Sequence, residues 1–150
     1  MSLELQREPG TIPLLEELLP MLELHWAEIA VYQDIPLDPD VETYAALEAQ
    51  GQLRIYTARE AGALRGYAVF FVRPNLHYKG SKQAWQDVFY IDPRERFRGG
   101  FMLVRYCEAA LRAEGVQVVY HHAKLINGFG QLLKTMKYQL VDEIYAKRLI

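Results

Sequence analysis

Residues 89–101 read Phe-Tyr-Ile-Asp-Pro-Arg-Glu-Arg-Phe-Arg-Gly-Gly-Phe, and this is the most informative segment of the chain. Its first part completes a strand-like hydrophobic run that begins at Ala84 and stops at Asp92-Pro93. A loop with two adjacent glycines follows, and the apolar pattern beyond it predicts a helix from about Phe101 to Ala113. A glycine-bearing loop that opens a helix exposes free backbone N–H groups at the positive end of the helix dipole. The sequence therefore predicts an anion site, suited to a pyrophosphate, between a strand and a helix.

Basic residues gather around this loop although the whole chain is slightly acidic. Between Arg94 and Arg112 five arginines stand against two glutamates, whereas the formal net charge of the chain is -2. The loop is not a Walker loop, because no Gly-Lys-Ser/Thr follows, and a Rossmann fingerprint would need a third glycine and an early strand. The loop alone leaves open the alternative of a tight turn with solvated arginines.

Hydrophobic periodicity places the other elements on both sides of this stretch. Strands are predicted near residues 2–7 and over Leu53–Arg59, Leu64–Arg73, Ala84–Ile91, Val116–His122 and Tyr138–Ile150. Helices are predicted over Leu14–Ile29, with a kink or restart at Pro20, and over Val41–Gln50 and Asn127–Thr135. Glu60-Ala61-Gly62-Ala63 predicts a hairpin turn. This order indicates an α/β fold in one domain, residues 1–150, with a single mixed central sheet flanked by helices.

The composition is that of an ordinary folded domain. The 150 residues are 51% hydrophobic and 24% charged, which excludes disordered and low-complexity proteins. Seventeen basic against 19 acidic residues do not favour a nucleic-acid partner. No stretch approaches the ~20 apolar residues that span a bilayer, and the first residues lack a signal-peptide pattern. With a single cysteine, Cys107, which excludes an internal disulfide, these features predict a cytoplasmic protein without a membrane partner.

These elements together resemble the GNAT family of acyl-CoA N-acyltransferases. Members carry a hydrophobic strand ending near Val-x-Pro, then Arg/Gln-x-x-Gly-x-Gly/Ala, then a helix. In this chain Ile91-Asp92-Pro93 is followed by Arg96-Phe97-Arg98-Gly99-Gly100-Phe101. Arg96 and Gly99 match the motif, whereas Phe101 takes the last small position and Gly100 is displaced by one. The resemblance covers most of the chain, and the stretch His121-His122-Ala123-Lys124 looks most like small members encoded by phages.

The resemblance implies a GNAT-like fold and acetyl-CoA as the acyl donor. Its pyrophosphate would lie on the backbone of the motif, formed by Arg96, Phe97, Arg98, Gly99, Gly100 and Phe101. Its pantetheine arm would pair like an added strand with the backbone of Phe89, Tyr90 and Ile91, where two strands splay apart. Asn127 would approach the pantetheine or the thiol end.

The activity that the resemblance implies is transfer of the acetyl group to a primary amine, which attacks the thioester directly. The acceptor would be a small molecule or a peptide, and the protein a monomer or a homodimer. In the family the general acid is often a tyrosine on the last helix. The corresponding position in this chain is Leu133 when counted back from Lys137, or Lys134 when counted forward from Asn127, and neither is a tyrosine. A catalytically weak CoA-binding domain with a regulatory or interaction role is therefore the alternative.

Asp87 is the candidate catalytic base. Strand alternation puts it in phase with Trp85, Phe89 and Ile91, on an otherwise apolar face. Burial there would raise the pKa of its carboxyl group toward a useful range. The alternative is an aspartate at the sheet edge that bonds a neighbouring loop.

His121 and His122 are the other catalytic candidates. Adjacent strand residues point to opposite faces, so the pair cannot chelate one metal, and no metal site is predicted. At most one of them faces the cleft, and its imidazole there could relay a proton. We favour His122 as the histidine that faces the cleft. Gln117 shares a strand face with His121, and its polarity argues against full burial of His121. A hydrogen-bonded core histidine is the alternative for each.

Overall fold

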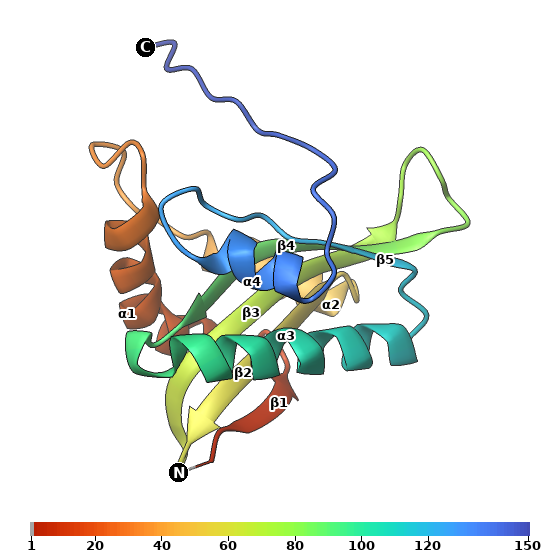
Figure 1. Cartoon of the computed structure of the whole chain (residues 1–150), viewed down its shortest axis with the longest axis horizontal. Helices are drawn as coiled ribbons and strands as arrows, with labels where there is room; N and C mark the ends of the chain where they lie inside the picture. Colours follow the sequence, from red (N-terminus) through yellow and green to blue (C-terminus); the bar gives the residue numbers. More distant parts are fainter. Residues whose placement is uncertain (1) are drawn as a thin grey trace.

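The computed structural model describes residues 2–150 and shows one central sheet with helices on both faces (Figure 1). In chain order the elements are β1 (Glu4–Glu8), α1 (Ile12–Ile29), α2 (Val41–Ala49), β2 (Leu53–Glu60), β3 (Ala63–Pro74), β4 (Lys82–Ile91), the 3-10 turn η1 (Pro93–Glu95), α3 (Arg96–Ala113), β5 (Val118–Tyr120) and α4 (Phe129–Thr135). None of the helices in this described part combines the length and hydrophobicity that crossing a bilayer requires.

The strands form a single sheet in the order β1-β2-β3-β4-β5. The first four strands are antiparallel, and β5 joins β4 in parallel. Alternation along β2 and β3 sends side chains to two hydrophobic cores: Ile55 and Val69 pack with α1 and α2, whereas Ala58 and Phe70 pack with α3. The predicted α/β fold with one mixed, helix-flanked sheet is confirmed.

Helix α1 runs without interruption through Pro20, so the restart predicted there is not seen. The hydroxyl of Thr11 caps its start by accepting from the Leu14 amide at 3.3 Å. Leu14, Leu15 and Leu18 bury one side of the helix, whereas Pro20 lies on the exposed side. A carbonyl that Pro20 leaves without an intrahelical donor can therefore be hydrated, which lowers the cost of the proline.

Helix α3 begins at Arg96, five residues before the predicted start. The Asp92 side chain accepts from the Arg94 amide at 2.9 Å and fixes the 3-10 turn that leads directly into the helix. Gly99 and Gly100 are consequently buried in the first turns of α3 and are not part of a loop. A carbon added at Gly99 would lie 3.0–3.1 Å from Leu3, Glu95 and Ile91, so this glycine allows close packing of α3 on the sheet.

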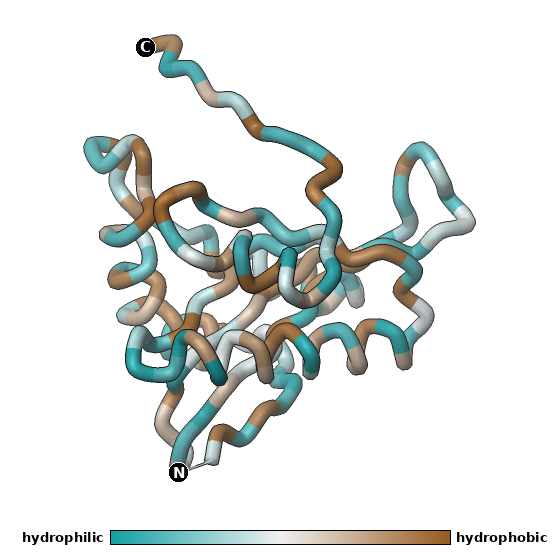
Figure 2. The backbone as a smooth tube through the Cα atoms, viewed as in Figure 1, coloured by the Kyte–Doolittle hydropathy of each residue, from teal (hydrophilic) through white to brown (hydrophobic). Residues whose placement is uncertain are grey.

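The end of the chain differs from its prediction. Strand β5 is restricted to three residues, and no strand forms over residues 138–150. A strand needs a neighbour for its backbone hydrogen bonds, and this segment lies beside no strand of its own sheet. Figure 2 shows hydrophobic stretches along it at a distance from the body of the protein.

The hairpin between β2 and β3 has the predicted turn, with a strained residue at its first central position. Ala61 has φ 48° and Gly62 φ 82°, the pair of positive values that a type I′ turn requires. An alanine in this region is disfavoured by about 1–2 kcal/mol, and asparagine tolerates it better. Ala61→Asn should therefore raise the free energy of unfolding, measured in urea, by about 0.5–1 kcal/mol. Ala63→Asn, on the exposed start of β3, should give no gain; an equal gain from both would contradict this reading of the turn.

Candidate active site

Strands β4 and β5 part in the middle of β4. Their parallel pairing covers Gln83 with Val118, Ala84 with Val119 and Trp85 with Tyr120, and then stops. Strand β4 continues to Ile91, so its remaining half has a backbone edge that no strand of the described residues pairs. Such an edge can accept an extended ligand as an added strand. The predicted splay at Phe89, Tyr90 and Ile91 is therefore a feature of the structure.

The side chain of Gln86 spans the point at which the two strands separate. Its Nε2 donates to the carbonyl oxygen of His122 at 3.2 Å, and its Oε1 lies 2.6 Å from Nδ1 of His121. Because that Gln86 oxygen can only accept, we assign the His121 proton to Nδ1. The buried Nε2 atom of His121 has no partner among the described residues. Gln86 thus holds β5 and the histidine pair in place beyond the end of the ladder.

A β-bulge at Asp87 sets the direction of the carboxylate. Val69 of β3 pairs with Val88 and the next residue, Phe70, pairs with Gln86, so Asp87 has no opposite residue. The extra residue changes the alternation, and Asp87 and Val88 both face α1 and α2 while Phe89 faces α3. The prediction that Asp87 shares a face with Phe89 and Ile91 is therefore wrong, because alternation was counted across a bulge that the sequence does not reveal.

Asp87 is held by a residue that sequence reasoning missed, Tyr44 of α2. The Tyr44 hydroxyl donates to Oδ2 of Asp87. Burial raises the pKa of Asp87 above its usual range, and the Tyr44 hydrogen bond and nearby His122 only partly oppose this. Burial likewise raises the pKa of Tyr44, which keeps its proton. A small cavity of about 50 Å³ adjoins the pair, and its lining is mostly apolar, with four leucines from α1.

The two histidines occupy different environments, as predicted. His121 is packed edge-on against the rings of Phe70, Phe129 and Tyr138. Burial lowers the pKa of His121 to about 4, so it is neutral at pH 7. His122 is exposed and lies on the same side as Asp87, where it favours the ionised form of the Asp87 carboxyl group. His121 is therefore the more buried of the two histidines, whereas the polar Gln117 on its strand face had argued against full burial of His121.

The start of α3 lies at the other end of the unpaired edge of β4. The first N–H groups of a helix lack partners within the helix, here those of Arg96, Phe97 and Arg98. Arg94 is paired with Asp92 at 2.7 Å, and Arg96 is paired with Glu28 of α1 and lies over the Tyr90 ring. Arg98 is exposed and forms no ion pair within residues 2–150. It is therefore the arginine of this turn that remains available for an anion.

Asn127 lies in the turn before α4. Its side-chain oxygen accepts from the Phe129 amide at 3.2 Å, which stabilises the start of the helix. Phe129 in turn stacks on Phe89 of β4, with ring centroids 4.5 Å apart. The predicted contact residues of β4 and the turn at Asn127 are thus brought to the same gap between β4 and β5.

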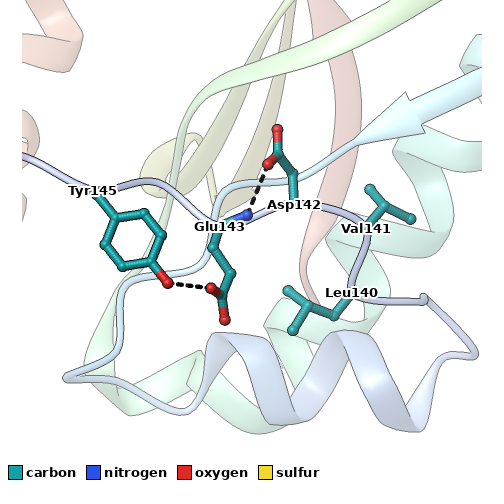
Figure 3. A pocket seen from close by; sticks show the side chains of 5 residues that line it. All are labelled: Leu140, Val141, Asp142, Glu143 and Tyr145. Atoms are coloured by element: carbon teal, nitrogen blue, oxygen red, sulfur yellow. Dashed lines mark hydrogen bonds between the residues drawn. The ribbon is translucent and has the colours of Figure 1, made fainter.

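A larger hollow, about 470 Å³, is not part of this site. Figure 3 shows that the five residues lining it, Leu140–Asp142, Glu143 and Tyr145, all belong to the chain after α4. No other element closes the hollow, so it offers a ligand neither enclosure nor converging polar groups.

Comparison with known proteins agrees with this geometry. A family model described as the acetyltransferase (GNAT) family matches residues 18–127, well over half of the chain. The chain belongs to the GNAT family. The match extends from α1 to the turn before α4 and so includes the bulge, the unpaired edge of β4 and the start of α3.

Several solved structures share the GNAT fold at low sequence identity. An aminoglycoside acetyltransferase from an uncultured soil metagenomic sample, in complex with sisomicin, has a TM-score of 0.73 and 16% identity, with 97% of each chain covered. A ribosomal-protein-alanine N-acetyltransferase from Brucella melitensis has a TM-score of 0.72, 17% identity and 99% of each chain covered. A predicted acetyltransferase with acetyl-CoA from Clostridium acetobutylicum has a TM-score of 0.73 and 12% identity, covering 98% of this chain and 96% of its own. No curated protein sequence matches this chain significantly.

The burial of His121 in this GNAT domain predicts that stability depends on pH. Because the folded pKa of His121 is about 4 against a usual 6.5, the unfolded state binds more protons between these values. Stability should therefore fall as the pH drops from about 6.5 toward about 4. His121→Gln, which removes the titrating ring, should flatten this part of the curve of unfolding free energy against pH. A curve for this variant that runs parallel to that of the parent would contradict the assignment.

Proposed function

We propose that this protein is an acetyl-CoA-dependent N-acetyltransferase that acetylates a primary amine. One observation carries the proposal: the unpaired edge of β4 connects a partly buried carboxylate, Asp87, with a helix start that can bind an anion. From Asp87 the strand continues for four residues to its end at Ile91, a length of about 13 Å at about 3.3 Å per residue. An extended arm with a reactive group at one end and phosphates at the other suits such an edge.

The chain's own groups fit the acyl donor. The N–H groups of Arg96–Arg98 and the charge of Arg98 would hold the pyrophosphate, and Gly99 and Gly100 bring α3 close to the sheet. Backbone groups of the stretch Phe89–Ile91 that point to the open edge of β4, and not to β3, would pair with the amide groups of the arm. Asn127, whose side-chain oxygen is already engaged, has its amide nitrogen left for the ligand. Bound acetyl-CoA supplies the thioester that the amine attacks.

Three groups of this chain would assist the attack. Asp87 takes a proton from the incoming ammonium group, because its raised pKa makes it a stronger base than an exposed aspartate. A backbone N–H on the free edge of β4 donates to the oxygen that becomes negative. His122, exposed on the same side as Asp87, donates the proton that the leaving sulfur takes up. We assign His121 to holding β5, since its Nδ1 proton is already bonded to Gln86.

The acceptor enters from the side of α1 and α2, because Asp87 faces these helices. The apolar lining of the small cavity next to Asp87 and Tyr44 supports an amine whose neighbouring carbons are apolar. The names of two structural relatives give different classes of acceptor, aminoglycosides in one case and the alanine of a ribosomal protein in the other. The shared fold therefore accommodates small-molecule and protein acceptors.

Release of the CoA thiol tests the proposed function. Acetyl-CoA is mixed with the protein and a panel of primary amines that includes alkyl amines, aminoglycosides and peptides with a free N-terminus. Free thiol should then appear in an amine-dependent manner, with one acetylated amine per thiol by mass spectrometry. Saturable binding of acetyl-CoA without thiol release for any amine would instead favour the CoA-binding alternative.

Arg98 should contribute to acetyl-CoA affinity through its charge. Arg98→Glu places a negative charge at the positive end of the α3 dipole, so the Kd measured by calorimetry should rise roughly tenfold, about 1.4 kcal/mol. The affinity of the parent should also fall with added salt more steeply than that of the variant. Arg105→Glu carries the same charge change about 10 Å further along α3 and should change the Kd much less. Equal losses from both variants would contradict a local site at the helix start.

A further inference from the structure

A buried tyrosine hydroxyl without a partner lies at the small cavity beside Asp87. Tyr67 of β3 has 1% of its surface accessible, and its hydroxyl has no hydrogen-bond partner among the described residues. Tyr67 lines the cavity of about 50 Å³ together with Asp87 and Tyr44. A buried hydroxyl that lacks a partner is costly to a fold, so its place at a cavity indicates a role toward a ligand.

The register of β3 and β4 places Tyr67 on the same side of the sheet as Asp87. Tyr67 pairs with Tyr90, and both residues belong to the core under α1 and α2, the helices that Asp87 faces. Burial raises the pKa of the Tyr67 hydroxyl, and the nearby Tyr90 and Asp87 raise it further. The hydroxyl therefore keeps its proton and lies near the carboxylate without a hydrogen bond to it.

The polar groups of this cavity suit an ammonium group. Tyr44 donates to Oδ2 of Asp87, which leaves Oδ1 for a ligand. An ionised carboxylate only accepts hydrogen bonds, and a hydroxyl oxygen accepts as well as donates. A primary ammonium group has three N–H donors, so it can bridge Asp87 and Tyr67. Once Asp87 has taken one proton, an N–H bonded to the Tyr67 oxygen would still hold the neutral amine in place.

The rest of the lining limits what can follow the nitrogen. A water-sized group needs about 10–15 Å³ of such space, so the cavity has room for about four non-hydrogen atoms, the nitrogen and three carbons. Polar groups on these carbons would be buried against aliphatic side chains, which is costly. The aliphatic lining residues are Leu15, Leu18, Leu19, Leu22, Pro39, Val41, Val69 and Val88.

We propose that the acceptor is a primary amine at the end of an unbranched alkyl chain, and that the Tyr67 hydroxyl binds its nitrogen beside Asp87. This inference rests on the proposed function and specifies its substrate class. The same chemistry occurs in a free alkyl amine and in the side chain of a lysine. An amino sugar, or the N-terminus of a peptide, carries polar groups next to the nitrogen-bearing carbon and does not fit the cavity.

Two isomeric amines test the substrate class by thiol release. n-Butylamine and sec-butylamine have the same atoms, but sec-butylamine is branched at the carbon that carries the nitrogen. The kcat/KM should be at least tenfold higher for n-butylamine. A lysine peptide with a blocked N-terminus separates the two sources: if it reacts as well as n-butylamine, the acceptor is a lysine side chain, and if it does not, a free alkyl amine. A kcat/KM for sec-butylamine equal to that for n-butylamine would overturn the proposal and leave the proposed function intact.

Tyr67→Phe tests the hydroxyl, because it keeps the ring and removes only the oxygen. The variant should be at least as stable as the parent in urea, since the hydroxyl has no partner in the fold. Its KM for n-butylamine should rise about tenfold, the effect of one hydrogen bond to a charged group, at an unchanged KM for acetyl-CoA.

Tyr56→Phe is the matched control. The Tyr56 hydroxyl is also buried without a partner among the described residues, but its ring packs in the core on the α3 side of the sheet. This variant should leave both KM values unchanged. An unchanged KM for n-butylamine in Tyr67→Phe, or an equal rise in Tyr56→Phe, would overturn the assignment of Tyr67.

Binding of n-butylamine separates this inference from the proposed function. In a protein with labelled leucine and valine methyl groups and with CoA present, the NMR signals of Leu15, Leu18 and Val69 should shift in a saturable manner, and Tyr67→Phe should weaken this binding. Such shifts without thiol release from acetyl-CoA would contradict the proposed function and support the amine site. Thiol release with other amines, without these shifts, would support the function and overturn the inference.

Discussion

Replacing Asp87 with asparagine is expected to lower the turnover number of acetyl transfer by about 100-fold or more, the scale of one general base. The amide has a similar shape and still accepts a hydrogen bond from the Tyr44 hydroxyl, but it cannot take a proton. The Kd for acetyl-CoA should change little, because backbone groups of β4 and α3 hold the donor. Turnover is followed by thiol release with the best amine of the panel, and the Kd by calorimetry.

Asp38→Asn, on an exposed loop, is the matched control and should leave both quantities unchanged. If Asp87→Asn retained the turnover of the parent, Asp87 would be a structural residue of the bulge. If it weakened acetyl-CoA binding as much as turnover, the change would act on the cleft as a whole and not on proton transfer.

The hydrogen bond from Tyr44 to Asp87 should affect the pH dependence of the acetyl-transfer rate. A base must be ionised to act, so the rate should fall as the pH drops through the pKa of Asp87, which burial raises above the usual aspartate range. The Tyr44 hydrogen bond partly lowers this pKa, and Tyr44→Phe should therefore move the acidic limb of the profile to higher pH. If Tyr44 had only a structural role, Tyr44→Phe would lower the rate without shifting the acidic limb of the pH profile.

Gly99→Val should have the largest effect on stability, a loss of about 2–3 kcal/mol in the free energy of unfolding. The first carbon added at Gly99 would lie 3.0 Å from Leu3 and 3.1 Å from both Glu95 and Ile91, and valine adds two more carbons to this site. The three neighbours belong to different parts of the fold, so relaxing one contact does not relieve the others. Urea unfolding of the purified variant measures the loss.

The adjacent glycine provides the control. At Gly100 an added carbon would meet the end of the Leu132 side chain at 3.3 Å and Ile91 at 4.0 Å, and a leucine terminus can shift. Alanine also favours the helix by about 1 kcal/mol over glycine, so Gly100→Ala should be neutral or stabilising. Equal destabilisation by the two variants would mean that the start of α3 needs both glycines for backbone flexibility and not for packing.

The middle of the fold was predictable because its signals are local. Turn residues separate β2, β3 and β4, and Asp92-Pro93 marks the end of β4 before the glycines of α3. The start of α3 was placed too late because glycines usually lower helix propensity, whereas packing against Ile91 and Leu3 requires Gly99 here. The segment from Tyr138 has strand-like residues, but strand formation depends on a neighbour, which sequence periodicity does not supply.

The site was predictable in its residue types and less so in its geometry. Asp87 stood out as a charge in an apolar run, but its direction depends on a bulge that shifts the register between Val69 and Phe70. Tyr44 lies 43 residues away in a helix with no buried residue, so no sequence spacing relates it to Asp87. Arg96 was counted in the local excess of basic residues, and only the fold shows that Glu28 of α1 pairs with it.

The proposed function rests on acetyl-CoA lying along the unpaired edge of β4, with its thioester near Asp87 and its phosphates at the start of α3. Titration of the isotopically labelled protein with acetyl-CoA, followed by amide NMR, tests this placement most directly. The amides of Phe97 and Arg98 and those of Phe89–Ile91 should shift in a saturable manner, while those of α2 and of residues 139–150 remain nearly unchanged. Saturable shifts confined to other elements, or no binding at all, would contradict it.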